Sequence, residues 1–239
     1  AGIFGLLTNS SSLYIIYDYG KDSIRGKFEL TIKEHRDDGG LDKNYALNYS
    51  YGVGETFSYM IPNIYGGASN TDLGTEKSAL KEAEQQFRTM IARLPQYWSD
   101  TSTTGPFYAG AIICFFFVLG LMLVKGPLRW AILAAAIFAI VLSWGKNAEA
   151  FSVFMLNNFP LYNKFRAVKI TLIITDFLLP FMAILGINEV VKNPGILREK
   201  QKEFFAAFTL TGGLSLLFYL LPDTFFSFDY LNPAISNQI

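Results

Sequence analysis

The first residues that could do chemistry are carboxylates set among glycines and tyrosines. They lie in two glycine-rich stretches, GGLDKNY at 39–45 and YGVGET at 51–56. Glycine lets the backbone approach a ligand closely, tyrosine rings cover the C–H surfaces of a sugar, and carboxylates accept hydrogen bonds from its hydroxyls. The pattern predicts substrate binding by Asp42, Lys43, Tyr51 and Glu55. The alternative is an ordinary loop in which Glu55 is solvated or caps a helix. The pattern matches no dinucleotide or phosphate-loop fingerprint.

A second candidate is the basic segment 159–169, FPLYNKFRAVK. Lys164, Arg166 and Lys169 fall within six residues of it. Cations beside the headgroup layer of a membrane suit the phosphate or pyrophosphate of a lipid ligand. The alternative is that these side chains only reach up to lipid headgroups, as basic residues near a membrane commonly do.

Asp176 is the third candidate, because it is the only charged residue in the run 170–188. An ionisable group inside a membrane is expensive and usually faces a partner or a water-filled cavity. Asp176 lies seven residues after Lys169, about two helical turns further on and on about the same face. We expect it in or beside a site, with Lys169 as the nearest cation. The alternative is a structural pair with a neighbouring helix.

The elements that hold these residues are predicted from where charge is missing. Four stretches have almost no charged residue, namely 107–124, 130–145, 170–188 and 204–222. A helix needs about 20 apolar residues to span the hydrocarbon core of a bilayer. The sequence therefore predicts a mainly α, polytopic transmembrane bundle, with complete spans at about 107–124, 128–145, 170–188 and 204–222. The alternative, a set of buried helices in a soluble core, would leave little polar surface.

Composition agrees with a membrane protein and excludes other classes. The chain has 239 residues, of which 51% are hydrophobic and 17% charged, and its formal net charge is zero. These values exclude a disordered chain and a nucleic-acid binder. One cysteine and one histidine exclude an internal disulfide framework and a His/Cys zinc site. No metal site and no cofactor are predicted, although a divalent cation is left open.

The polar stretch 9–106 is predicted to be a mixed α/β loop domain. Alternating apolar and polar residues at 28–33 favour a strand, and apolar residues three and four apart favour an amphipathic helix over 75–94, before Pro95. Residues 1–8 are interpreted as the end of a truncated transmembrane helix, and 223–239 as a truncated extracytoplasmic tail. The sequence is therefore expected to be an internal fragment of a longer protein.

Basic residues in the short loops predict the orientation. The 125–129 turn has two basic residues in five, and the 189–203 loop has four in fifteen. The 146–169 loop has four in twenty-four, so its density is lower. By the positive-inside rule the first two loops are cytoplasmic. This places 146–169 and the long loop 9–106 on the extracytoplasmic side.

Five motifs in order resemble the bacterial YfhO-like membrane protein family. They are GLDKNYALNYSYGVGET, MIPNIYGG, LPQYWSDTSTTGPFYAGAI, LSWGKN and FPLYNKFRAV, and the resemblance runs from about Ser12 to Pro222. The family looks like the GT-C class of membrane glycosyltransferases. The resemblance implies a multi-pass protein of the bacterial cytoplasmic membrane that uses sugars carried on polyprenyl phosphate at the outer face and decorates cell-envelope polymers.

The resemblance also implies how the candidate residues are used. Asp42 and Glu55 match charged positions of the family's outer-loop motif. Lys164, Arg166 and Asp176 match its basic loop and its acidic helix position. The acidic catalytic residue of such enzymes usually lies in a first outer loop, which is expected to precede residue 1, so the catalytic residue is unknown here.

Three functions fit the sequence. The first is sugar transfer with inversion from a polyprenyl-phosphate-linked donor to a glycan or polymer acceptor, in which a carboxylate takes the acceptor proton and cations stabilise the leaving phosphate. The second is a transporter or flippase-like protein without chemistry. The third is a non-catalytic component of envelope assembly, with 9–106 as a docking module.

Overall fold

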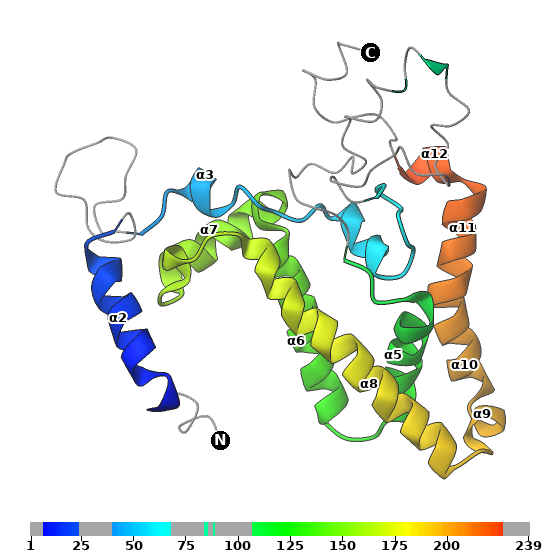
Figure 1. Cartoon of the computed structure of the whole chain (residues 1–239). Coiled ribbons are helices and arrows are strands. Elements are labelled where there is room, and N and C mark those ends of the chain that lie inside the picture. The colour runs from blue at the N-terminus through cyan, green and yellow to red at the C-terminus, as the bar shows by residue number, and fades with distance from the viewer. Residues whose placement is uncertain (1–6, 24–39, 68–83, 86–87, 89–106, 227–239) are drawn as a thin grey trace.

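The protein is mainly helical over the residues that the structure describes (Figure 1). The computed structural model describes residues 7–23, 40–67, 84–85, 88 and 107–226. No β-strand occurs in these ranges. The predicted strand at 28–33 and nearly all of the predicted helix at 75–94 lie outside the described residues, so the mixed α/β loop domain stays a prediction.

The apolar stretches form the long helices. They are α5 (Ala111–Leu123), α6 (Leu128–Ser143), α8 (Leu172–Lys192), and the continuous series α10 (Gln201–Phe208), η6 (Thr209–Gly213) and α11 (Leu214–Leu220). The 3-10 turn η5 (Val168–Thr171) leads directly into α8, and η6 is one turn of π-helix. The charge-free stretches therefore locate the helices to within a few residues.

Two of these helices, Val168–Lys192 and Gln201–Leu220, are long and apolar enough to cross a membrane. α6 joins the segment Gly145–Asn158 at a bend of 110°. If these two helices form a single broken span, the described residues contain three candidate spans. α5 has 13 residues and is about 20 Å long, which is short of the roughly 30 Å hydrocarbon core. The prediction of helices with the length and apolar composition of membrane spans is thus confirmed for two helices. A bundle of four complete spans stays a prediction.

α5 begins four residues later than its apolar run because the chain is bound elsewhere. Gly110 has a φ of +115°, a conformation that favours glycine. The backbone N–H groups of Ala109 and Gly110 donate to the carbonyl of Tyr59 at 3.1 and 3.0 Å. These two bonds tie the start of α5 to the preceding loop instead of extending the helix.

α5 lies between α8 on one side and α10 on the other. Gly120 of α5 faces Gly186 of α8 so closely that a Cβ on Gly186 would lie 2.7 Å from the Cα of Gly120. Small residues of this kind let the backbones of membrane helices approach each other. On the other side, Phe115 of α5 packs edge-to-face on Phe204 of α10, with 5.6 Å between ring centroids.

α6 packs on the other flank of α8 through small residues and threonine hydroxyls. Thr171 Oγ1 donates to the carbonyl of Ala139 at 2.9 Å. Ala136 and Ala139 are buried under α8. The helices therefore lie in the order α6, α8, α5, α10–α11.

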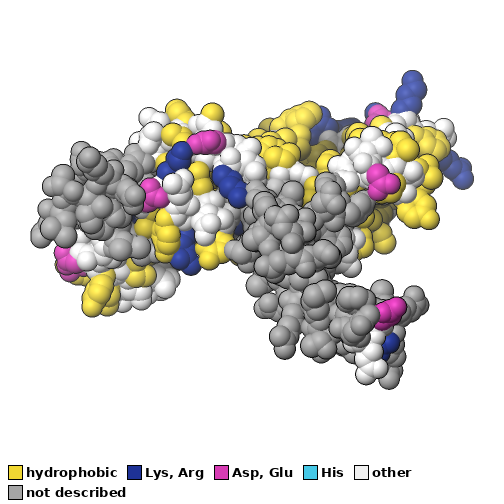
Figure 2. Space-filling view, turned by 90° about the horizontal axis from the view of Figure 1, so that it is seen from above, with side chains coloured by type: hydrophobic (Ala, Val, Ile, Leu, Met, Phe, Trp, Pro, Cys, Tyr) yellow, Lys and Arg dark blue, Asp and Glu magenta, His cyan; other side chains and the backbone are white. Residues whose placement is uncertain are grey.

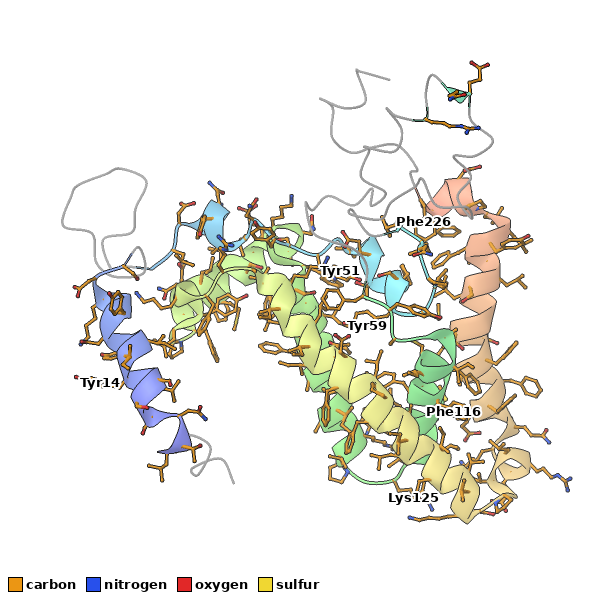
Figure 3. All side chains as sticks on the ribbon, viewed as in Figure 1. Tyr14, Tyr51, Tyr59, Phe116, Lys125 and Phe226 are labelled. Carbon is orange, nitrogen blue, oxygen red and sulfur yellow. The ribbon has the colours of Figure 1, made fainter. Side chains whose placement is uncertain are left out.

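Residues 40–67 cover one end of these helices, and we call this segment the cap. It contains the short helix α3 (Lys43–Ala46) and the 3-10 helix η1 (Gly54–Tyr59). Tyr51 and Tyr59 point from it toward the helices, whereas Lys125 lies at the far end (Figure 3). The end that bears the cap is called the cap end below.

The remaining helices are short. η3 (Gly145–Ala148) and α7 (Glu149–Asn158) follow α6, and η4 (Tyr162–Lys164) precedes η5. α9 (Ile196–Glu199) and α12 (Pro222–Phe225) flank the last long helix. α2 (Ser10–Lys21) has no buried side chain and stands apart from the bundle in Figure 1.

Candidate functional site

The cap is attached to the helix ends by the motifs that the sequence singled out. The Tyr51 N–H donates to the carbonyl of Ser143 at 2.7 Å, and the Lys169 N–H donates to the carbonyl of Tyr49 at 3.3 Å. The Asn147 side-chain amide donates to the carbonyl of Tyr51 at 2.9 Å. The stretches around residues 50, 145 and 168 therefore meet at one place, at the cap end of α6 and α8.

Gly145 makes this junction possible. Its φ is +48°, in the left-handed region that favours glycine. A Cβ there would lie 2.1 Å from Ser50 Oγ and 2.7 Å from a methyl group of Val168. Ser50 Oγ in turn accepts the Lys146 N–H at 2.8 Å. A larger residue at this position would be strained and would have to displace the side chains of Ser50 and Val168.

Glu55 and Lys169 form a buried ion pair under the cap. Glu55 Oε2 lies 3.9 Å from Lys169 Nζ, and their side chains are 1% and 8% exposed. Glu55 Oε1 accepts the Gly52 N–H at 3.1 Å. Lys169 Nζ lies over the rings of Tyr51 and Phe107, at 4.9 and 5.4 Å from their centroids. Glu55 is therefore turned inward rather than toward a surface ligand, and Lys169 is directed at Glu55 rather than at lipid headgroups.

Two buried tyrosines extend this polar cluster. Tyr51 donates its hydroxyl proton to the carbonyl of Glu55 at 2.6 Å, and its oxygen lies 2.7 Å from Ser58 Oγ. Tyr59 donates to the carbonyl of Leu172 at 3.3 Å. Burial raises the pKa of both phenols well above the usual value, and the nearby charges of Glu55 and Asp176 raise it further. Both tyrosines therefore stay neutral hydrogen-bond donors.

Asp176 lies on the surface of α8, close to Tyr59. Its side chain is exposed, and the charge of its carboxylate raises the pKa of the Tyr59 phenol. Ile173 and Phe177 beside it on α8 are 67% and 66% exposed. The carboxylate is thus displayed on an otherwise apolar part of the helix, one turn from the cap.

The basic segment is divided by the structure. Lys169 is buried, whereas Arg166 is exposed. The Arg166 guanidinium donates to the Tyr45 hydroxyl at 2.6 Å and lies 5.1 and 5.2 Å from the ring centroids of Tyr45 and Tyr49. Lys164 lies in η4 and is half-buried. The three cations do not form one cluster, and Arg166 is the member that is presented on the cap surface.

Asp42 and Lys43 have separate roles in the cap. Asp42 is the N-cap of α3, where its carboxylate accepts the N–H groups of Asn44 and Tyr45 at 2.8 and 3.1 Å. Aspartate is a preferred residue at this position. Lys43 is exposed, and its Nζ lies 2.6 Å from Glu149 Oε1 of α7. Asp42 therefore holds α3, and Lys43 joins α3 to α7.

A cavity of about 310 Å³, partly open to solvent, lies where α3 meets the beginning of α7. Its lining consists of two lysines, one carboxylate, two amides and one leucine: Lys43, Lys146, Glu149, Asn44, Asn48 and Leu47. Basic and acidic side chains also lie close together in the view onto the cap end (Figure 2). The cavity thus combines cations that bind anions with oxygen and amide groups that bind hydroxyls.

The described residues contain no group of three or more His, Cys, Asp or Glu side chains that could hold a metal ion. The chain matches no protein-family model, no curated protein and no solved structure.

Sequence reasoning missed Glu149 and Lys146 as cavity residues, and Tyr59 as the neighbour of Asp176. No spacing pattern could pair Glu149 with Lys43, because 106 residues separate them. The LSWGKN motif that contains Lys146 was a usable signal. The sequence motifs therefore include the segments that contain Lys43 and Lys146, but they do not predict the contact of Lys43 with Glu149.

Proposed function

We propose that this chain is part of an integral-membrane glycosyltransferase of the bacterial cytoplasmic membrane. The enzyme would take a sugar from a polyprenyl-phosphate carrier and transfer it to a glycan or polymer of the cell envelope. In this proposal four helical spans cross the membrane, near residues 107–124, 128–145, 170–188 and 204–222, and the cap lies on the extracytoplasmic side. The observation that carries the proposal is the cavity of about 310 Å³ between α3 and α7, at the end of the apolar helices.

The lining of the cavity suits a phosphorylated sugar. Lys43 and Lys146 supply cations for phosphate oxygens, and Glu149 supplies a carboxylate for sugar hydroxyls. The amides of Asn44 and Asn48 both donate and accept hydrogen bonds. Both side chains of the Lys43–Glu149 pair are about half exposed to solvent. Breaking this pair therefore costs little free energy, so the two charges can bind a ligand instead of each other.

The position of the cavity suits a lipid-linked donor. The membrane-length helix Val168–Lys192 begins directly beside the cap. A polyprenyl chain could stay in the bilayer while its phosphate reaches the cap surface, where Arg166 is exposed next to Tyr45. Arginine is well suited to phosphate because its planar donors can bind two oxygens at once.

The proposed reaction is a single displacement with inversion. The acceptor hydroxyl oxygen forms a bond to the anomeric carbon, and the bond from that carbon to the phosphate oxygen breaks. A carboxylate takes the acceptor proton, and cations stabilise the charge on the leaving phosphate. Asp176 is proposed to contact substrate at the membrane side of the cap, and no described residue is assigned as the base.

Binding of polyprenyl phosphate to the purified full-length protein in nanodiscs tests the proposal. Each charged hydrogen bond contributes about 1.5–3 kcal/mol, and about 1.4 kcal/mol corresponds to a tenfold change in affinity. The double variant Lys43→Ala/Lys146→Ala should therefore bind at least about tenfold more weakly. Lys192→Ala is the matched control, because Lys192 also pairs with a glutamate on the surface, at 3.9 Å, but at the opposite end of α8.

Equal affinity of the double variant and the wild type would contradict the cavity as the phosphate site. A second measurement separates transfer from transport. Release of the donor's sugar, either to an acceptor or to water, supports the enzyme, whereas movement of an unchanged donor across the membrane supports the transporter or flippase instead.

A further inference from the structure

α7 turns away from the bundle at the cap end. The segment Gly145–Asn158 is bent by 110° from α6, and α7 extends sideways from the upper end of α6 in Figure 1. α6 packs along α8, whose helix is long enough to cross a membrane. A helix at nearly a right angle to such a helix, at its end, lies close to the plane of the membrane surface. We call α7 and the loop after it, residues 149–167, the α7 hairpin.

The α7 hairpin displays large apolar side chains. The exposed fractions of Phe154, Phe159, Leu161 and Phe165 are 59%, 56%, 62% and 67%. Apolar groups gathered on a surface in this way indicate contact with a membrane or with another protein. Four exposed large apolar side chains within twelve residues therefore indicate that this surface contacts lipid or another protein.

The two sides of α7 face different surroundings. At about 100° per residue, Phe151 and Phe154 lie about 160° and 140° around the helix from Glu149. Glu149 is paired with Lys43 of the cap. Phe151 packs edge-to-face on Phe138 of α6, with 6.1 Å between ring centroids. The polar side of α7 is thus turned to the cap, and the aromatic side to the flank of α6.

The apolar surface of the hairpin continues onto that flank. Ile137 and Phe138 of α6 are 52% and 46% exposed, and Phe138 contacts Phe151. The lipid bilayer around α6 can cover both surfaces. It surrounds the flank of α6 and reaches the aromatic side of α7. Arg166, exposed beside Phe165, supplies a cation at the level of the phosphates.

We propose that the α7 hairpin lies in the interfacial layer of the lipid bilayer. Phe154, Phe159 and Phe165 lie at the boundary of the acyl chains, about 5–10 Å into the layer, and Arg166 lies among headgroup phosphates. The hairpin then fixes the height of the cap and its cavity above the hydrocarbon core. This position is independent of whether the protein transfers sugars.

Depth-dependent quenching tests the position of the hairpin. Single cysteines replace Phe154, Phe159 or Phe165 in a Cys114→Ala background and carry the fluorophore NBD. The whole chain is reconstituted in phosphatidylcholine vesicles, with or without lipids that bear a nitroxide at carbon 5 of the acyl chain. Cysteines at Asn48 and Val53 are the matched controls. Both residues are exposed in the cap, at the same end of the helices as the hairpin, where we expect water rather than lipid.

At the three hairpin positions the NBD emission should be blue-shifted, and the nitroxide lipid should remove most of its fluorescence. At Asn48 and Val53 the emission should stay water-like, and the nitroxide should have little effect. Water-like, unquenched emission at the hairpin positions would overturn the proposal. Blue-shifted but unquenched emission would also overturn it, because a protein surface rather than lipid would then cover the aromatic side chains. Because all five substituted side chains are exposed, each variant should unfold at the temperature of the parent.

Discussion

Glu55 Oε2 and Lys169 Nζ lie 3.9 Å apart beneath the cap, and both side chains are almost completely buried. Breaking a buried pair by removing one partner costs about 3–5 kcal/mol, because the remaining charge loses its buried counter-charge. We expect Glu55→Gln to lower the free energy of unfolding by about that amount, measured by thermal or denaturant unfolding in detergent.

The exposed pair Lys43–Glu149 provides the matched control for this prediction. Glu149→Gln should change the free energy of unfolding by about 0–1 kcal/mol, as is usual for surface pairs. The double variant Glu55→Gln/Lys169→Met should recover most of the loss, because no buried charge remains. A Glu55→Gln protein as stable as the wild type would show that the pair does not hold the cap.

Alkaline pH should lower the stability of the folded protein through the ionisation of Tyr51 and Tyr59. Burial raises the pKa of both phenols above the value of about 10 that applies in an unfolded chain. Their contribution to stability is therefore complete below about pH 10 and is lost as the pH rises above that value, since the unfolded chain releases these protons first. Unfolding temperatures between pH 8 and pH 12 measure the effect.

Tyr59→Phe is the control for the alkaline effect. It removes one titrating group, so the loss of stability above about pH 10 should be less steep than in the wild type. An unchanged slope would show that Tyr59 ionises equally easily in the folded and unfolded chains.

The contact between Gly120 and Gly186 should not tolerate a methyl group. A Cβ on Gly186 would lie 2.7 Å from the Cα of Gly120 and 3.1 Å from the carbonyl of Phe116, so α5 and α8 must separate. We expect Gly186→Ala to destabilise the protein by about 1–3 kcal/mol, the usual effect of overpacking. Gly213→Ala is the control, since its Cβ would meet only Thr209 at 3.4 Å, and thermal unfolding should show little change.

Asp176→Asn should affect activity more than folding. The carboxylate is exposed on α8, so its neutralisation leaves no buried charge without a partner. If it contacts substrate, loss of one charged hydrogen bond should lower donor turnover by the full-length protein roughly 10–100-fold. Asp223→Asn, an exposed carboxylate in α12, should leave turnover unchanged. An Asp176→Asn protein that is active but poorly folded would assign this residue to the scaffold.

Labelling from the two sides of the membrane tests the predicted orientation. In the Cys114→Ala background, a cysteine at Val53 should react with an impermeant maleimide in intact cells, whereas one at Gln201 should react only after the cells are opened. Both positions are exposed, so burial does not limit either reaction. The reverse pattern would place the cap in the cytoplasm.

The sequence predicted the helices well where apolar composition alone decides the structure. The runs 170–188 and 204–222 lie within Val168–Lys192 and, but for two residues, within Gln201–Leu220. The start of α5 was predicted four residues too early, at Phe107, because composition cannot show that Ala109 and Gly110 donate to Tyr59.

The site was less predictable because its contacts are distant in sequence. Asp42 has the position and residue type of a helix N-cap, so its role at the start of α3 could be predicted from the local sequence. Two ion pairs depend on how the cap folds over the helix ends. They are the buried pair Glu55–Lys169 and the exposed pair Lys43–Glu149. No residue spacing within one segment carries that information.

The attachments of the cap have a consequence for the order of synthesis. The cap precedes α6, yet Ser50 and Tyr51 each bind partners that lie 96 residues later in the chain. At translation rates of about 5–20 residues per second, the cap waits roughly 5–20 s for those partners. We expect the nascent chain to be open to proteases and holding chaperones during this interval. The cap should become protected only once Lys169 has emerged from the ribosome.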